Sequence, residues 1–403
     1  MLLDHLQSKL DALAAAGLAR SVRSAATPTA VRQTVLGADG TARALRMFCS
    51  NDYLGFAGDP RLAEALAEGA RAWGAGAGAS HLISGHSVAH ARLQDDFADW
   101  YAPYIPGARA ITFCTGYLAN IAVLTALGDA DAQIFSDKLN HASLIDGCLL
   151  ARAAVQRYPH ADLAALRRQL QASRARIKLI VTDGVFSMDG DIAPLAALLV
   201  LAEEFDTWLV VDDAHGFGVL GRDGRGTLEH FGVRSERIVL VGTLGKAAGI
   251  SGAFVAAHPR IVQYLLQAAR PYVFSTATPP AIAHALRTSL ALIGGPDGRA
   301  ARARLAQLGT RLGEGLAGLL RRRPALPWRP VPSTTPIHPL VIGGNDETMR
   351  LAAALEARGL RVPGIRPPTV PAGTARLRIT LCAAHGDDDV DALLAALDEA
   401  AAP

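Results

Sequence analysis

Short apolar runs alternate with longer segments of helical periodicity from residue 110 onward. Five of these runs have the length and aliphatic content of buried strands: Ala110–Cys114, Gln133–Ser136, Ile177–Thr182, Trp208–Val211 and Ile238–Val241. Segments with helical periodicity fill the intervals between them. The alternation predicts an α/β fold with a mostly parallel sheet between helices, in which ligands bind at the carboxyl ends of the strands.

The pattern changes after a helix predicted over Pro279–Ile293. The glycine-rich cluster at Gly294–Gly298 predicts a joint between domains. Beyond it we expect a helix near Ala300–Arg321, strands near Ile337–Ile342 and Ala375–Leu381, and a terminal helix from Asp387. The chain therefore divides into an N-terminal helix and arm (1–50), a large domain (51–293) and a smaller C-terminal α+β domain (294–403).

Composition is typical of a soluble globular protein. Half of the 403 residues are apolar, and 40 basic and 37 acidic side chains give a formal net charge of +3. These charges are interspersed, without the basic stripe that nucleic-acid binders use. Met1–Arg20 predicts an amphipathic helix and not a signal peptide, and no run reaches about 18 apolar residues. We expect a cytoplasmic protein that binds neither nucleic acid nor a membrane.

Two local patterns suggest a site at first, but their context does not support one. The glycine run at 74–79 follows a helical segment, whereas the dinucleotide fingerprint follows a strand. His86 and His90 can share a helix face, but no carboxylate or cysteine close in sequence completes a zinc set. The four cysteines are too widely spaced for a CxxC pair. We predict no metal site and mostly buried, reduced thiols.

The informative chemistry follows two consecutive predicted strands. Asp212, Asp213 and His215 come after one strand, and Thr243 and Lys246 come after the next. Taken singly, each has an ordinary explanation, such as a turn cap or a solvated lysine. Together they bring carboxylates, an imidazole and an amine to one sheet edge. Pyridoxal phosphate requires such a set, because it needs a lysine for a Schiff base and an acid beside its ring nitrogen.

The pair of motifs Asp-x-x-His and Thr-x-x-Lys resembles the α-oxoamine synthases, a family of fold-type-I pyridoxal-phosphate enzymes. Further motifs of that family occur in the same order: Ser50–Gly55, Ile83–Gly85, Asn140–Ser143, Asp183–Gly190 and Ser275–Thr276. The resemblance thus extends over nearly the whole chain. It implies the fold-type-I transferase architecture and an acyltransferase that joins an amino acid to an acyl thioester, with loss of carbon dioxide.

The resemblance implies which residues contact the cofactor ring. Lys246 would form the Schiff base, and Asp212 would keep the ring nitrogen protonated. Asp212 is preferred to Asp213 because it matches the first aspartate of the family motif, and alternation sends the two side chains to opposite faces. His215 and Ser187 would contact the phenolic oxygen of the ring. His141 would stack on the ring face; with Lys246, Asp212 and His215 it completes the candidate catalytic set.

The resemblance also implies a phosphate site at Gly116 and Tyr117, where a predicted strand turns into a helix over 118–127. A helix N-terminus offers free amides and a favourable dipole, although a plain strand-to-helix turn explains this segment equally well. Thr243 resembles another phosphate ligand. Thr276 would reach the phosphate of the neighbouring subunit, which implies a homodimer with shared active sites.

Substrate-binding residues come from the same resemblance. Alternation sends Arg376 and Arg378 to one face, and Arg378 matches the ligand of the amino-acid carboxylate, a group suited to a guanidinium fork. Asn51 would share that carboxylate with Arg378, and His141 would also bind the substrate. Thr369 lies in Ile365–Arg378, a segment that resembles the family members using L-alanine and a pimeloyl thioester in biotin biosynthesis. Arg20, in the predicted N-terminal helix, aligns with a residue that meets the acyl substrate.

Two alternatives stay open. A sister enzyme such as 2-amino-3-ketobutyrate coenzyme A ligase or 5-aminolevulinate synthase would share the same lysine, aspartate and histidines, and would differ in its amino acid and acyl group. A non-catalytic cofactor-binding regulator would carry an added basic helix-turn-helix, which the sequence does not show. Fold and site motifs by themselves do not prove turnover. The acyl carrier, coenzyme A or acyl carrier protein, is not determined by the sequence.

Overall fold

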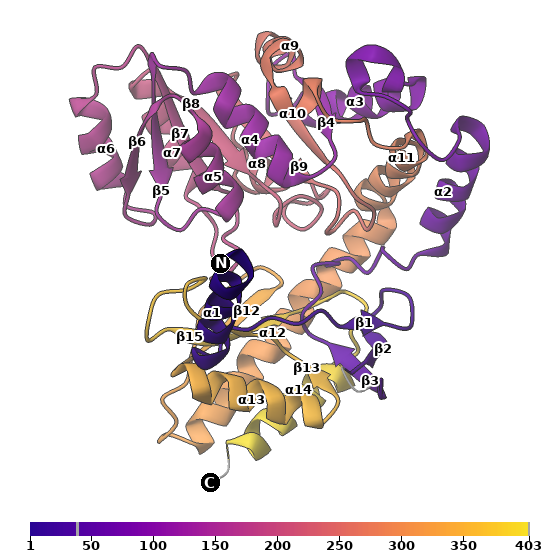
Figure 1. Ribbon diagram of the computed structural model, residues 1–403, viewed down its shortest axis with the longest axis vertical. Helices are drawn as coiled ribbons and strands as arrows, with labels where there is room; N and C mark the ends of the chain where they lie inside the picture. The colour runs from indigo at the N-terminus through magenta and orange to yellow at the C-terminus, as the bar shows by residue number, and fades with distance from the viewer. Residues whose placement is uncertain (38–39, 402–403) are drawn as a thin grey trace.

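The computed structural model describes residues 1–37 and 40–401 and forms two lobes joined by a long helix (Figure 1). The upper lobe in Figure 1 holds a seven-stranded sheet in the order β4-β10-β9-β8-β7-β5-β6. Its strands are β4 (Arg109–Phe113), β5 (Ala132–Asp137), β6 (Ala154–Tyr158), β7 (Ile177–Asp183), β8 (Trp208–Asp212), β9 (Ile238–Thr243) and β10 (Ala253–Ala257).

The predicted α/β fold is confirmed in this lobe. The five predicted strands correspond to β4, β5, β7, β8 and β9. The strands from β9 to β6 run parallel, and β10 runs antiparallel to both β4 and β9. The polar residues that follow β7, β8 and β9 therefore meet at one edge of the sheet.

Helices cover both faces of the large sheet, which explains why its strands are continuously apolar. In β8, Leu209 and Val211 belong to one buried cluster and Val210 belongs to the other, as expected when successive side chains point to opposite faces. The helices of this lobe are α2 (Pro60–Trp73), α3 (Val88–Tyr101), α4 (Gly116–Leu127), α5 (Ala142–Leu150), α6 (Leu163–Ala172), α7 (Leu195–Glu204), α8 (Thr227–Phe231), α9 (Pro259–Ala268), α10 (Arg270–Val273) and α11 (Pro280–Gly294).

The lower lobe contains a second sheet in the order β11-β12-β15-β14. Its elements are β11 (Arg329–Pro330), β12 (Ile337–Gly343), β14 (Gly364–Ile365), β15 (Ala375–Thr380), and the helices α12 (Pro296–Arg322), α13 (Asn345–Ala357) and α14 (Asp387–Ala400). The strands and helices predicted for this region are therefore present. The division of the chain at residues 50/51 and 293/294 stays a proposal.

The predicted break at Gly294–Gly298 is wrong in extent, because Gly295 alone separates α11 from α12. Pro296 and Asp297 occupy the first turn of α12, where a proline and an acidic residue are both favourable. Gly298 is helical, and a Cβ there would lie 2.0 Å from the Ile293 carbonyl oxygen. This glycine therefore permits close packing of two helices and does not mark a flexible joint.

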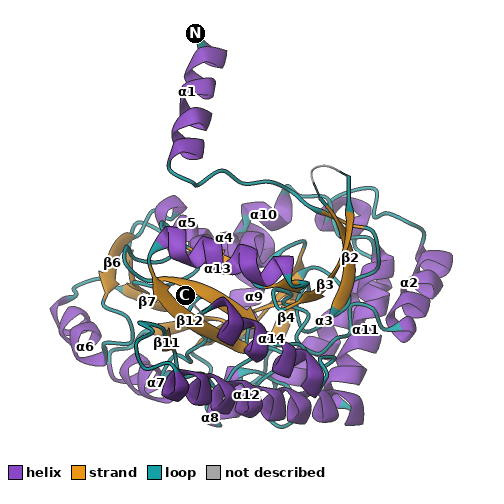
Figure 2. Cartoon of the chain, turned by 90° about the horizontal axis from the view of Figure 1, so that it is seen from below, coloured by secondary structure: helices purple, strands orange, loops and turns teal. Residues whose placement is uncertain are grey.

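The N-terminal arm is built into the lower lobe. The arm contributes three strands to a separate sheet: β1 (Ser24–Ala25), β2 (Arg32–Leu36) and β3 (Ala42–Met47). The fourth strand of this sheet is β13 (Leu360–Arg361), which runs parallel to β3. Helix α1 (Leu2–Ala15) projects away from the rest of the molecule and has no buried residue (Figure 2). Among residues 1–37 and 40–401, no helix is long and apolar enough to cross a membrane.

The prediction that Arg20 lies in the N-terminal helix is wrong, because α1 ends at Ala15. Gly17 adopts a positive φ of 64°, and the amides of Gly17 and Leu18 donate to the carbonyl groups of Ala14 and Leu13. This bonding pattern is a Schellman helix end, which requires the left-handed conformation that glycine adopts without strain. Arg20 therefore lies in the connection that follows the helix.

Candidate active site

Lys246 and His215 lie together at the carboxyl edge of the large sheet. The Nζ atom of Lys246 is 3.0 Å from Nε2 of His215, and the Tyr53 hydroxyl is 2.5 Å from Nδ1 of the same ring. Burial lowers the pKa of Lys246, and the negative charge of Asp212 only partly offsets this effect. Burial thus favours the neutral form of the amine, which is the form that reacts as a nucleophile.

His215 is buried, and its imidazole is held neutral. Burial, together with the positive charge of Lys246, lowers the pKa of His215 well below its usual range. A neutral imidazole has one donor and one acceptor nitrogen, so the two contacts to Tyr53 and Lys246 use both ring nitrogens.

The neighbouring carboxylates Asp212 and Asp213 have different surroundings. Oδ2 of Asp212 accepts a hydrogen bond from the side-chain amide of Asn120 on α4 at 2.6 Å, and Oδ1 accepts from the Ala214 amide at 2.9 Å. Asp213 accepts from the Thr227 amide at 2.9 Å, at the start of α8, and burial raises its pKa to about 8. Of the two, Asp212 lies on the α4 side of the sheet.

The candidate phosphate site lies at the N-terminus of α4. Thr115 caps the helix by accepting a hydrogen bond from the Leu118 amide at 3.2 Å. Gly116 is packed so closely against Thr243 that a Cβ at residue 116 would lie 2.3 Å from Cγ2 of the threonine. Tyr117 is exposed beside them, and its hydroxyl donates to Asp146. The N-terminus of α4 thus combines a glycine, a hydroxyl group and free helix amides, which together favour the binding of an anion.

Arg378 and Asn51 are brought together from distant parts of the chain. Arg378 donates to the Ser187 carbonyl oxygen at 2.6 Å and, through NH1, to Oδ1 of Asn51 at 3.3 Å. The neighbouring Arg376 forms an ion pair of 2.5 Å with Asp189. In the part of the chain that the structure describes, Arg378 has no carboxylate within salt-bridge distance. Its charge is thus available for the carboxylate of a ligand.

Arg20 and Thr369 line one pocket, although they are far apart in sequence. The pocket has a volume of about 720 Å³ and lies between α1 and the segment 364–369. Leu10 and Leu13 contribute an apolar wall, whereas Arg20 and Arg366 contribute positive charge. An apolar chain attached to an anionic carrier would match both features.

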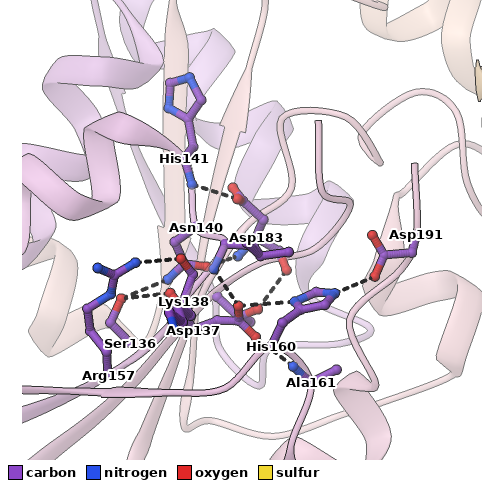
Figure 3. Close-up of polar contacts among 12 residues, drawn as sticks. Ser136, Asp137, Lys138, Asn140, His141, Arg157, His160, Ala161, Asp183 and Asp191 are labelled. Atoms are coloured by element: carbon purple, nitrogen blue, oxygen red, sulfur yellow. Dashed lines mark hydrogen bonds and ion pairs between the residues drawn. The ribbon is translucent and has the colours of Figure 1, made fainter. Parts of the chain in front are cut away.

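His141 begins α5, and a buried network fixes its backbone (Figure 3). The His141 amide donates to Oδ2 of Asp183 at 2.8 Å, and its Nδ1 lies 2.7 Å from the Ser143 hydroxyl. Asn140 donates to the Val181 carbonyl oxygen at 2.8 Å and accepts from the Asp183 amide at 3.0 Å. The imidazole itself remains exposed, as a residue that stacks on a ligand must be.

Asn120, Tyr53 and Asp183 are site residues that sequence reasoning missed. Asp183 is buried at the end of β7, beside Asp212 on β8, and burial and the charge of Asp212 raise its pKa well above the usual range. A signal for Asp183 was present, because it opens the motif at 183–190. For Asn120 no signal was visible, because it lies on an apolar helix and its partner is on a distant strand.

Thr276 lies on the surface, paired with Ser80 in an isolated β-bridge. Its carbonyl oxygen accepts a hydrogen bond from the Cys114 thiol at 3.4 Å. Phe274, close to Thr276 in sequence, and Ile83, close to Ser80, are 70% and 80% exposed, which is unusual for large apolar side chains. The role of Thr276 toward a second subunit stays a prediction.

His81 joins His86 and His90 in a cluster that sequence reasoning did not anticipate. One ring nitrogen of each lies within 4.8 Å of the others. Nδ1 of His90, however, accepts from the Ser87 amide at 3.1 Å, and its Nε2 lies 2.8 Å from the Thr278 carbonyl oxygen. His81 and His86 are hydrogen-bonded to each other at 3.0 Å. These hydrogen bonds account for the cluster as a packing feature.

Comparison with known proteins shows the family of this chain. The family aminotransferase class I and II matches residues 46–397. A protein of Polaromonas naphthalenivorans named 8-amino-7-oxononanoate synthase is 62% identical over 400 residues, which cover 99% of this chain and 98% of that protein.

Solved structures agree as well. A serine palmitoyltransferase of S. paucimobilis with a bound PLP-myriocin aldimine superposes with a TM-score of 0.88 at 27% identity, covering 98% of this chain and 96% of that one. The 8-amino-7-oxononanoate synthase of Francisella tularensis gives a TM-score of 0.74 at 31% identity, covering 88% of this chain and 97% of that one.

Proposed function

Because this chain belongs to the aminotransferase class I and II family, we propose that it acts as an 8-amino-7-oxononanoate synthase dependent on pyridoxal phosphate. It condenses L-alanine with a pimeloyl thioester and releases carbon dioxide. The near full-length identity of 62% to a protein of that name supports the activity. Within the structure, the observation that carries the proposal is the partly buried Lys246 beside His215 and Asp212 at one sheet edge.

The residues at this edge fit pyridoxal phosphate. The close approach of Gly116 to Thr243 leaves backbone amides of α4 open to a phosphate. The carboxylate of Asp212 is fixed by Asn120, and so can meet a ring nitrogen without moving. Burial lowers the pKa of Lys246 and so favours the uncharged amine that Schiff-base formation needs. Ser187, His215 and His141 would contact the ring, and Tyr117 would add a phosphate contact.

The chain's own residues then have separate tasks in the reaction. When bound, pyridoxal phosphate withdraws electrons from the Cα atom of the amino acid. Arg378, with Asn51, holds the alanine carboxylate and so orients the bond that breaks. Nζ of Lys246 takes the Cα proton of alanine. Asp212 holds a proton at the ring nitrogen, where a nearby buried anion is most effective.

The acyl substrate would bind in the pocket between α1 and residues 364–369. Its apolar wall suits the methylene chain of a pimeloyl group, and Arg20 and Arg366 suit the phosphates of coenzyme A or of a carrier protein. Thr369 lies at the same pocket. We further propose that two copies of the chain form a homodimer in which Thr276 reaches the phosphate site of the partner.

One experiment tests the activity directly. Purified protein with pyridoxal phosphate is incubated with L-alanine and pimeloyl coenzyme A, and the product is identified by mass. The expected product has the mass of 8-amino-7-oxononanoate, whereas Lys246→Ala gives none. Glycine with acetyl or succinyl coenzyme A, and serine with palmitoyl coenzyme A, serve as competing pairs. A higher specificity constant for any of these pairs would assign the chain to a sister synthase.

A further inference from the structure

His160 lies between two carboxylates that belong to different segments of the chain (Figure 3). Its Nδ1 is 3.1 Å from Oδ1 of Asp137, and its Nε2 is 2.8 Å from Oδ2 of Asp191. The ring also meets Phe186 edge to face, with centroids 4.4 Å apart. His160 is thus in contact with three residues on two segments, and none of its contacts was part of the candidate active site.

The two contacts of His160, to Asp137 and to Asp191, form a bridge with two arms. The arm through Asp137 connects His160 to the segment that carries His141. Asp137 ends β5 and is almost fully buried, and its carboxylate also accepts hydrogen bonds from the amides of Leu139 at 2.8 Å and Ala161 at 2.9 Å. These bonds shape the turn that runs into Asn140 and His141. Any displacement of Asp137 would therefore shift the ring that we propose to stack on the cofactor.

The arm through Asp191 connects His160 to the loop that carries Ser187. The loop from 184 to 191 closes on itself, because the Phe186 amide donates to the Asp191 carbonyl oxygen at 2.9 Å and Val185 pairs with Ile192. Ser187 is at the tip of this loop, where Arg378 also binds its carbonyl oxygen. Asp191 lies at the base of the loop, so His160 contacts the loop at its base, whereas Arg378 contacts it at Ser187.

The charge of His160 suits this bridge. Burial opposes the charged form, but the hydrogen bonds to Asp137 and Asp191 outweigh it and raise the pKa of His160 to about 10. The ring is therefore an imidazolium near neutral pH, with both nitrogens donating. Charge-assisted hydrogen bonds are about twice as strong as neutral ones, which makes the link between the two segments stiff.

We propose that His160 is a positioning residue that ties the segment carrying His141 to the loop carrying Ser187, and thereby fixes both cofactor-facing side chains. The proposal rests on the proposed function, since it assigns those two residues to pyridoxal phosphate. A positioning role for His160 differs from a purely structural role in one respect. Loss of the bridge weakens cofactor binding, whereas loss of a structural contact changes only the stability of the fold.

The test compares His160→Gln, Asp191→Asn and the double variant with the wild type. His284→Gln is the matched control, because His284 is exposed to a similar degree and lies 3.8 Å from a carboxylate, that of Glu68, on helices α11 and α2. Each apoprotein is titrated with pyridoxal phosphate, and the visible circular dichroism of the bound cofactor is recorded. Thermal unfolding of the apoproteins is measured separately.

Each single variant should weaken cofactor binding about tenfold and reduce the visible dichroism, and the double variant should be no worse than the singles, because either change opens the same bridge. His284→Gln should stay within about twofold of the wild type. The proposal is overturned if His160→Gln lowers the unfolding temperature but leaves cofactor affinity and dichroism unchanged. It is also overturned if the effects of the two changes multiply in the double variant.

These readouts separate the proposal from the proposed function. If the wild type binds pyridoxal phosphate but makes no product from alanine and pimeloyl coenzyme A, the activity is wrong while the bridge is still judged by cofactor affinity. If the wild type is active and His160→Gln binds the cofactor normally, the bridge alone is wrong. Should His160→Gln fail to fold, Asp191→Asn decides the matter, because Asp191 is 34% exposed and its change removes one arm only.

Discussion

Tyr53 and Lys246 contact opposite nitrogens of His215, at 2.5 Å and 3.0 Å. Burial raises the pKa of Tyr53 to about 12, so its hydroxyl keeps its proton, which has two acceptors in reach: Nδ1 of His215 at 2.5 Å and Oδ1 of Asn51 at 3.2 Å. Donation to Nδ1 leaves the proton of the neutral ring on Nε2, facing Lys246, whereas donation to Asn51 leaves it on Nδ1. Tyr53 thus couples the tautomer of His215 to the hydrogen bonds of Asn51.

This relationship predicts the effect of Tyr53→Phe. The substitution keeps the ring but removes the hydrogen bond between Tyr53 and Nδ1 of His215, and the loss of one partner of a buried hydrogen bond costs about 1–3 kcal/mol. We expect turnover to fall on the order of tenfold, with the thermal stability changed little. Steady-state kinetics and an unfolding curve check this. Normal turnover in the variant would show that His215 does not need its contact with the Tyr53 hydroxyl.

Lys246→Ala should abolish covalent cofactor binding. The purified wild-type protein should be yellow, because a Schiff base between lysine and pyridoxal phosphate absorbs visible light. The variant should fold and should still bind the cofactor non-covalently, since the phosphate contacts at Gly116 and Thr243 are unaffected. Without the covalent bond, dialysis should remove this cofactor. Absorbance before and after dialysis measures the difference. An unchanged spectrum in the variant would contradict the assignment of Lys246.

Asp212→Asn should preserve the fold and slow the reaction severely. The amide can still pair with Asn120 and the Ala214 amide after reorientation, but it cannot balance a positive charge on the ring nitrogen. Breaking a buried ion pair costs about 3–5 kcal/mol, which corresponds to a rate loss on the order of a thousandfold. Asp213→Asn is the control, since Asp213 bonds to the start of α8. A larger loss of rate in Asp213→Asn than in Asp212→Asn would assign the ring nitrogen to Asp213.

The strand ends could be predicted from sequence because each buried strand is an uninterrupted apolar run followed by polar residues. That pattern places Asp212, His215 and Lys246 on one edge without any knowledge of tertiary contacts. Strand β10 was missed because its sequence, AFVAA, is rich in alanine, a poor strand former. Strand β6 was missed because it is a largely exposed edge strand with polar residues.

Contacts between distant segments could not be predicted. Asn120 reaches Asp212 because α4 packs on the large sheet against β9 and β10, next to β8. Arg378 reaches Ser187 because the lower lobe contacts the loop that follows β7. Neither contact leaves a periodic signal in sequence. The end of α1 is different, since Gly17 did carry a helix-stop signal that the amphipathic pattern outweighed.

If Thr276 serves the phosphate site of a partner, cofactor affinity should depend on protein concentration. Dilution below the dimer dissociation constant should release pyridoxal phosphate, because each site loses one of its ligands. Fluorescence titration at several protein concentrations, combined with light scattering, measures both equilibria. A monomer that is fully active and saturated with cofactor would rule out a shared site.

The charge of His160 predicts how the stability of the apoprotein depends on pH. An unfolded histidine has a pKa near 6.5, whereas the bridge to Asp137 and Asp191 raises the pKa of His160 in the folded state to about 10. The folded state therefore binds the proton more tightly, and the stabilisation is complete below pH 6.5 and is lost as the pH rises toward 10. Relative to His160→Gln, the wild-type advantage in free energy of unfolding should shrink over this interval. Denaturant unfolding at several pH values, with His284→Gln as control, measures it. A difference that stays constant with pH would mean that His160 is neutral and that the bridge lacks its charge.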